Sequence, residues 1–300
     1  MEHRQDNLLA CILMVAGMAI FSVEDLFLKW TAVALSPGQV LLMTGLAGAV
    51  LLGIASEWRG QRIISPYVFR RQVVIRNLSE ALSSGLYVAA LALIPLSVNA
   101  ALLQASPLVT TLGAALFLRE SVGWRRWSAI GAGFVGVLVI LRPGTDGFEW
   151  AGLLTVACVI VLAARDIATR GMPGEIGSLQ LMTWAYIALV PAGIAMLWFS
   201  GTPLVAPDPA QWVMLACALV AGLAGYAAIT VALRMGEVSV VMPFRYTRLV
   251  FTMAFAIVLA GERPDMLTYA GSALVIASGL YTFWRETRLS RRRTKAFLNR

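Results

Sequence analysis

The feature that most constrains this chain is a succession of apolar segments, each about as long as a lipid bilayer is thick. A helix needs about 20 predominantly apolar residues to cross the hydrocarbon core, and the 300-residue sequence divides into ten such stretches. They span residues 8–29, 38–57, 72–94, 97–118, 127–141, 151–170, 179–199, 211–233, 238–260 and 265–284. Lipid offers the backbone no hydrogen bonds, so only helices and closed barrels cross it. Segments of this length predict an all-α integral membrane protein with ten transmembrane helices.

The composition leaves no room for a separate soluble domain. Charged residues make up 13% of the chain and hydrophobic residues 59%, with a mean hydropathy of +0.78, whereas soluble domains carry about 25% charged residues. The net charge of +8 comes from Arg and Lys in the loops and the C-terminal tail. With a cytoplasmic N-terminus, seventeen of these residues lie on the cytoplasmic side and three on the other. This positive-inside bias predicts a bacterial inner-membrane protein with both termini in the cytoplasm, and not a nucleic-acid-binding protein.

The two halves of the sequence repeat weakly. A shift of 142 residues places Ser97-Val98 on Ser239-Val240 and Glu120 on Glu262, and a shift of 141 places Asp25 and Lys29 on Asp166 and Arg170. Each half holds five crossings, an odd number, so the halves must be inverted relative to one another. Secondary transporters use inverted repeats around a site at the membrane midplane. The predicted boundaries are a cytoplasmic tail at 1–7, repeats at 8–142 and 149–285, and a basic tail at 286–300 that contacts anionic lipid.

Charged residues interrupt several of the apolar segments. A charge at a helix centre costs roughly 2.5–3.5 kcal/mol even on insertion scales, and such residues normally face the bundle interior or a wet cavity. They are Glu24, Asp25, Arg76, Glu80, Arg165, Asp166, Arg245 and Arg248. The sequence therefore predicts a polar pathway between the helices.

A substrate-binding site is expected in the cytoplasmic half of the membrane, where most of these charges lie. Arginine suits planar recognition of carboxylate or phosphate and stacks on aromatic faces. The predicted substrate-binding residues are Arg245, Arg248, Arg165, Asp166, Glu80, Arg76, Gln104, Tyr246 and Asn77. Two structural alternatives stay open: Arg76 snorkels to the interface, or Arg245 and Arg248 form ion pairs with Glu80 or Asp166.

Glu24 and Asp25 form a second predicted group. They are expected in the outer half of the membrane with few cationic partners, Lys29 excepted. Buried carboxylates of this kind bind cationic groups or take up protons. They are therefore the candidates for proton coupling.

The chain resembles the EamA-type proteins of the drug/metabolite transporter superfamily over nearly its whole length. The resemblance rests on Leu93-Ile94-Pro95-Leu96-Ser97, on Arg119-Glu120, on the glycine-rich run from Gly131 to Gly136, and on Gly261-Glu262. It implies ten helices in two inverted repeats and transport by alternating access. The second half has no counterpart of Pro107, and Pro243 is expected to supply the equivalent bend.

The leading expectation for function is an exporter of an amino acid or a related small polar metabolite. The alternative is an uptake carrier for a vitamin or nucleoside-like compound such as riboflavin or S-adenosylmethionine, and a channel is a weaker reading. An enzyme is not expected, because the sequence has one histidine, His3, and neither HExxH nor GxSxG. No cofactor or metal is expected. Expected partners are a small-molecule substrate, protons and lipid, with a homodimer through glycine-rich faces as a weaker alternative.

Overall fold

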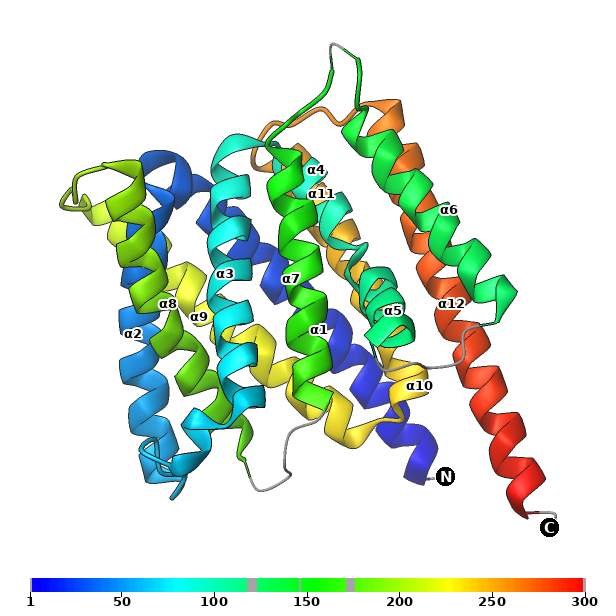
Figure 1. Ribbon diagram of the computed structural model, residues 1–300. Coiled ribbons are helices and arrows are strands. Elements are labelled where there is room, and N and C mark those ends of the chain that lie inside the picture. The colour runs from blue at the N-terminus through cyan, green and yellow to red at the C-terminus, as the bar shows by residue number, and fades with distance from the viewer. Residues whose placement is uncertain (1, 118–122, 146, 171–175, 299–300) are drawn as a thin grey trace.

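The computed structural model describes residues 2–117, 123–145, 147–170 and 176–298 (Figure 1). Within these ranges the chain is almost entirely helical and has no strand. The first half consists of α1 (Glu2–Ala34), α2 (Pro37–Trp58), the 3₁₀ helix η1 (Pro66–Phe69), α3 (Arg71–Leu93), α4 (Leu96–Leu103), α5 (Ser106–Phe117) and α6 (Trp124–Leu141). The second half consists of α7 (Gly152–Arg170), α8 (Ser178–Ser200), α9 (Pro209–Met235), α10 (Val238–Val241), η2 (Met242–Tyr246), α11 (Thr247–Val258) and α12 (Met266–Leu298).

The ten predicted segments all fall on helices, two of which are broken. The fourth crossing is α4 followed by α5, and the ninth is α10, η2 and α11 in succession. Eight helices of the described chain are long and apolar enough to count as membrane spans on composition alone. The two crossings outside that count are α3, which carries Arg76 and Glu80, and the broken ninth crossing.

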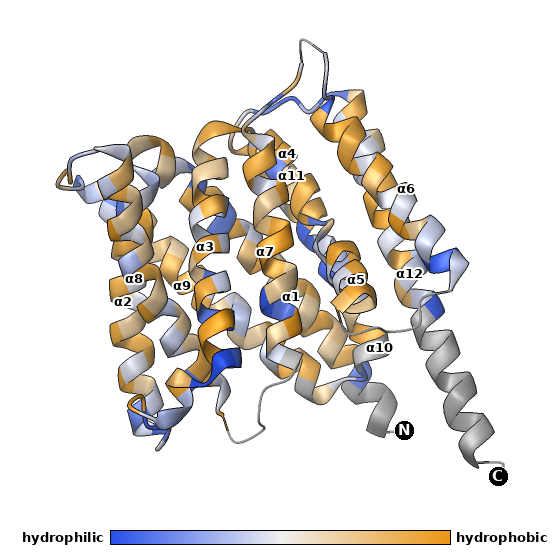
Figure 2. Ribbon diagram, viewed as in Figure 1, coloured by the Kyte–Doolittle hydropathy of each residue, from blue (hydrophilic) through white to orange (hydrophobic). Residues whose placement is uncertain are grey.

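The outer surface of the bundle is suited to lipid. Along α2, the side chains of Leu46, Val50 and Ile54 recur every four residues and are 49%, 59% and 48% exposed. Figure 2 shows helices that are hydrophobic along most of their length, with hydrophilic positions part-way along α3. A continuous apolar face of this kind in contact with solvent would be an aggregation liability in a soluble protein.

Both chain termini lie at the same end of the bundle (Figure 1). We call this the terminal end, and the opposite end, with the loops 142–151 and 259–265, the distal end. Two of the predicted boundaries need adjustment: α1 is already helical at Glu2, and α12 continues to Leu298, so much of each predicted tail is helical. Glu120, which the repeat shift pairs with Glu262, lies outside the described residues.

Each half packs mainly against the other half. The helix pairs with the most extensive contacts are α1 with α9, α2 with α8, α3 with α7, and α6 with α12. The halves correspond in order, so α1 matches α7, α2 matches α8, α3 matches α9 and α6 matches α12. Exchanging the matched helices converts the α1–α9 pair into the α7–α3 pair and leaves the α2–α8 and α6–α12 pairs unchanged. This pattern is the one that two inverted five-helix repeats produce around a pseudo-twofold axis in the membrane plane.

The two broken helices break at equivalent positions. The α4–α5 break lies at Gln104 and Ala105, and η2 ends at Tyr246, which the 142-residue shift places on Gln104. These two equivalent residues also touch, because the Gln104 side-chain amide donates to the Tyr246 carbonyl oxygen over 3.4 Å. Pro243, which was expected to supply a bend, lies in the first turn of η2, where the helix changes from α to 3₁₀. The axis that relates the repeats therefore passes near these breaks.

Candidate functional site

The most buried ionic group of the interior is Asp25 on α1, which is 1% exposed. Arg248 on α11 binds both of its carboxylate oxygens, with Nη2 2.6 Å from Oδ1 and Nε 3.1 Å from Oδ2. The Tyr87 hydroxyl donates to Oδ1 over 2.5 Å, and the Thr252 hydroxyl lies 3.3 Å from Oδ2. A bidentate arginine–carboxylate pair with further hydrogen-bond donors is among the strongest polar contacts in proteins.

The expectation that Asp25 has few cationic partners is wrong. It was placed near the outer end of a segment ending at residue 29, but α1 continues to Ala34. Asp25 therefore lies deeper along its helix, at the level where α1 contacts α11. Each helical residue adds 1.5 Å along the helix axis. The additional residues at the end of α1 therefore place Asp25 farther from that end than the apolar segment suggested.

Three neighbours of this pair were not predicted. Ser22 donates to the Arg248 carbonyl oxygen over 3.1 Å and accepts from Thr252 over 2.8 Å. The guanidinium carbon of Arg248 lies 5.1 Å from the centroid of the Phe21 ring, within the range of a cation–π contact. Helical spacing was the available signal, because Ser22 precedes Asp25 by three residues and Thr252 follows Arg248 by four.

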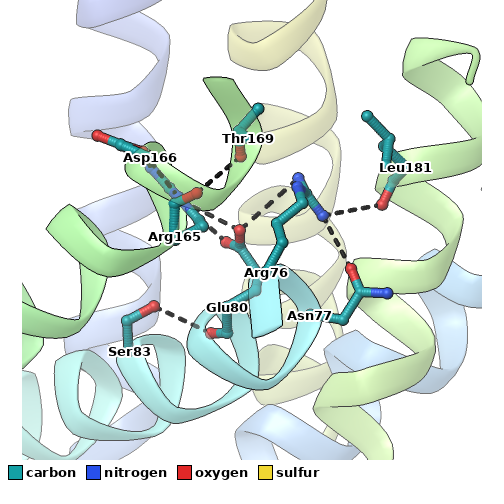
Figure 3. A network of polar contacts seen from close by, with 8 residues as sticks. All are labelled: Arg76, Asn77, Glu80, Ser83, Arg165, Asp166, Thr169 and Leu181. Atoms are coloured by element: carbon teal, nitrogen blue, oxygen red, sulfur yellow. Dashed lines mark hydrogen bonds and ion pairs between the residues drawn. The ribbon is translucent and has the colours of Figure 1, made fainter. Parts of the chain in front are cut away.

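A second charged cluster joins α3 to α7 (Figure 3). Arg165 Nη1 lies 3.3 and 3.2 Å from the two carboxylate oxygens of Glu80. Its Nε and Nη2 lie 3.0 and 2.8 Å from Asp166 Oδ1. The side chains are 24%, 21% and 32% exposed, so this cluster remains partly accessible. Arg165 and Asp166 are adjacent on α7, so the long Arg165 side chain folds back to reach that carboxylate.

Arg76 does not snorkel to the interface. The residue is 7% exposed, and its Nη1 donates to Asn77 Oδ1 over 3.0 Å and to the Leu181 carbonyl oxygen over 3.1 Å (Figure 3). Its Nη2 also lies 3.8 Å from Glu80. Arg76 therefore ties α3 to α8 at the terminal end, with Asn77 accepting a second hydrogen bond from the same nitrogen. These contacts explain how α3 carries an arginine into the bundle.

Arg245 and Glu24 differ from the other embedded charges. Within the described residues, neither forms a hydrogen bond or an ion pair. Arg245 on η2 is exposed, yet it lies within electrostatic range of Asp166, Arg165 and Arg248. Glu24 is half-buried and lies against Gly222 of α9, where an added Cβ would come within 2.5 Å of its Oε1. Arg245 and Arg248 were both predicted to bind substrate, but Arg248 is held by Asp25, and of the two only Arg245 has no partner among the described residues.

Gln104 and Tyr246 take part in helix packing. Both are 8% exposed, and the Tyr246 hydroxyl lies against Gly279 of α12, with no hydrogen-bond partner among the residues that the structure describes. The ring of Tyr246 thus points into the bundle, while its neighbour Arg245 remains exposed. The structure does not bring these two adjacent side chains to one surface.

The embedded charges balance. Four arginines (Arg76, Arg165, Arg245, Arg248) accompany four carboxylates (Glu24, Asp25, Glu80, Asp166), and six of the eight are paired within the protein. No group of three or more metal-ligating side chains occurs among the described residues. Among the described residues, Glu24 and Arg245 are the two embedded charges without a hydrogen bond or an ion pair.

Comparisons with known proteins agree with this architecture. A riboflavin transporter of Rhizobium johnstonii is 29% identical over 93% of this chain and 92% of its own length. An S-adenosylmethionine uptake transporter of Rickettsia prowazekii is 23% identical over 88% of this chain and 89% of its own. The pseudopaline exporter CntI of Pseudomonas aeruginosa is 22% identical over 89% of this chain and 93% of its own.

The family model described as "EamA-like transporter family" matches twice, at residues 8–142 and 149–284. The two matches cover both halves of the bundle, including the broken helices and every charged residue of the site. The chain therefore belongs to the EamA-like transporter family.

Proposed function

We propose that this transporter takes up an uncharged or zwitterionic heterocyclic metabolite by alternating access, with riboflavin as the first candidate. Export of a related metabolite, which the sequence favoured, becomes the alternative. The relative with the highest identity reported above is named for riboflavin and is similar over 93% of the chain. The bundle is proposed to sit in the inner membrane with its terminal end in the cytoplasm.

The observation that carries this proposal is the balance of buried charge. Asp25 is neutralised by Arg248, and Glu80 and Asp166 share Arg165. A ligand with no net charge can bind beside these pairs without displacing either partner, whereas separating one pair would cost several kcal/mol. Riboflavin is uncharged at neutral pH and has a planar ring system with carbonyl acceptors and a polyol chain.

Arg245, Asp166 and Glu24 are proposed to contact the ligand. The exposed guanidinium of Arg245 has free donors for ring carbonyl oxygens, while Asp166 and the unpaired Glu24 can accept from N–H or hydroxyl groups. Glu24 also remains the candidate for proton coupling. Arg248, Arg165, Glu80, Arg76, Asn77, Gln104 and Tyr246 are proposed to position these residues and the helices that carry them.

The test is uptake of radiolabelled riboflavin by a bacterial strain that can neither make nor import it. The parent chain should accumulate the label and support growth at low external riboflavin. Arg245→Ala should lower uptake about tenfold or more, because a hydrogen bond to a charged group is worth about 1.5–3 kcal/mol. Arg263→Ala, which changes an exposed arginine of the distal loop, should leave uptake unchanged.

Two results would contradict the proposal. Transport of S-adenosylmethionine without riboflavin would reassign the substrate to a cation, for which unpaired Glu24 is the available counter-charge. Efflux from preloaded proteoliposomes, with no uptake from outside in cells, would reverse the direction.

A further inference from the structure

Glu262, in the loop after α11, binds the start of α4 at the distal end. Its Oε1 accepts from the Leu96 backbone N–H over 2.6 Å, and its Oε2 accepts from the backbone N–H and the hydroxyl of Ser97 over 2.9 and 2.6 Å. These N–H groups belong to the first turn of α4, where no partner exists within the helix. The positive end of the helix dipole also favours a carboxylate at this position.

Lys29 on α1 fastens the adjoining turn. Its Nζ donates to the Ile94 carbonyl oxygen over 2.7 Å, and Ile94 is the residue that ends α3. Lys29 also lies within electrostatic range of Glu262 and Glu149. The short turn between α3 and α4 is therefore held on one side by α1 and on the other by the loop after α11.

A further ion pair links the halves at the same end. Arg142, at the end of α6, pairs with Asp265, whose carboxylate also accepts from the backbone N–H of Thr268 over 3.0 Å. Slight burial opposes ionisation of Asp265, but these donors outweigh it and lower its pKa to about 2. This contact therefore remains ionic at any physiological pH.

Apart from the contact between Gln104 and Tyr246 at the breaks, the described parts of the two broken crossings pack together mainly at this end. α4 contacts α11, whereas α5 has no comparable contact with α10, η2 or α11 among the described residues. The same asymmetry appears elsewhere, because α1 contacts α3 but their counterparts α7 and α9 are not in comparable contact. In two inverted repeats, each element at one end of the bundle has a counterpart at the other end. Because these contacts are made at the distal end and their counterparts at the terminal end are not, the distal end is closed and the terminal end is more open.

We propose that Glu262 is a positioning residue for transport, which keeps the distal end closed by holding α4 against the end of α11. The inference rests on the proposed transport cycle. When the distal end opens to admit a ligand, α4 and α11 must separate, and the three hydrogen bonds to Glu262 must break. No other carboxylate of the described residues bonds to the start of α4, so removal of this one shifts the resting population toward the open distal end.

The experiment measures access from the distal side with a membrane-impermeant thiol reagent. The native cysteines Cys11, Cys158 and Cys217 are first replaced by serine or alanine, and Ala256→Cys is introduced. Ala256 is 0% exposed on α11 and packs in the same apolar cluster as Leu96, so its replacement reports separation of these helices. Adding Glu262→Gln should accelerate labelling about tenfold, the population shift expected from losing hydrogen bonds to a charged group.

Glu149→Gln is the matched control. It removes the same charge at the same end, and Glu149 is exposed with no side-chain hydrogen bond among the described contacts. Its labelling rate should equal that of the parent. Equal acceleration in both variants, or none in Glu262→Gln, would overturn the proposal.

Ser97→Ala provides a second reading if Glu262→Gln fails to reach the membrane. It removes only the hydroxyl donor of Ser97 and should accelerate labelling by a smaller factor, whereas an unchanged rate would count against the proposal. Labelling needs no substrate, so the result is independent of whether riboflavin is transported.

Discussion

Arg248 and Asp25 lie on helices from different halves of the chain, so one buried ion pair joins the two repeats. The pair also organises its surroundings, since Tyr87 and Thr252 complete the hydrogen bonds of the carboxylate. A buried pair of this kind adds little stability relative to apolar residues of the same size, but losing one partner leaves an uncompensated charge. The pair is therefore expected to be sensitive to single substitutions.

Arg248→Ala should destabilise the protein by about 3–5 kcal/mol, the range measured for breaking buried ion pairs. It should also abolish most uptake, because Asp25 is left without its bidentate partner. Thermal unfolding in detergent and riboflavin uptake measure the two effects. The double variant Asp25→Asn, Arg248→Met should recover much of the stability but not the transport. A single variant that unfolds at the temperature of the parent would contradict the assigned burial.

At the scale of the helices, the apolar segments of the sequence predicted where all ten helical stretches lie, although α3 and the ninth stretch fall outside the eight spans that length and composition alone identify. Proline placement anticipated the break at η2, because Pro243 cannot donate a backbone hydrogen bond. The partners of each charge could not be predicted in the same way. Residue spacing tells which face of a helix carries Asp25 or Arg165, but only the crossing of α1 over α11 and of α3 beside α7 decides which charges meet. The depth of Asp25 also depended on five helical residues beyond the apolar segment.

The packing of η2 against α12 gives a prediction for two glycines. An added Cβ at Gly279 would lie 1.8 Å from the hydroxyl oxygen of Tyr246, and that side chain is too buried to move freely. Gly279→Ala should therefore destabilise the protein by about 1–3 kcal/mol, the usual cost of overpacking. Gly131→Ala on α6 meets nothing within 4 Å and should be neutral or stabilising by about 0.5–1 kcal/mol. Equal thermal stability of the two variants in detergent would contradict this account of the η2–α12 contact.

At the scale of the whole molecule, the interior charges explain why α3 looks less like a membrane span than its neighbours. Arg76 and Glu80 lower its hydropathy, but both side chains bind partners on other helices, namely Arg165 and the Leu181 carbonyl oxygen. The cost of inserting them is offset inside the bundle and not in lipid. The ninth crossing falls outside the count of membrane spans because η2 divides it into two short α-helices, α10 with 4 residues and α11 with 12. Irregular backbone at membrane depth is tolerated where it is buried in protein.

These two crossings decide which loops lie across the membrane from the N-terminus, so reporter fusions can test the topology. With ten crossings and a cytoplasmic N-terminus, the loops 142–151 and 201–208 both lie outside. If α3 and the ninth crossing did not span, both loops would lie inside, while the C-terminus would be cytoplasmic in either case. Alkaline phosphatase fused after Gly144 or Leu204 should therefore be active, and a fluorescent protein fused after Arg300 should fluoresce. Inactive fusions at both loops, with normal expression, would show that the charged third helix does not cross the bilayer.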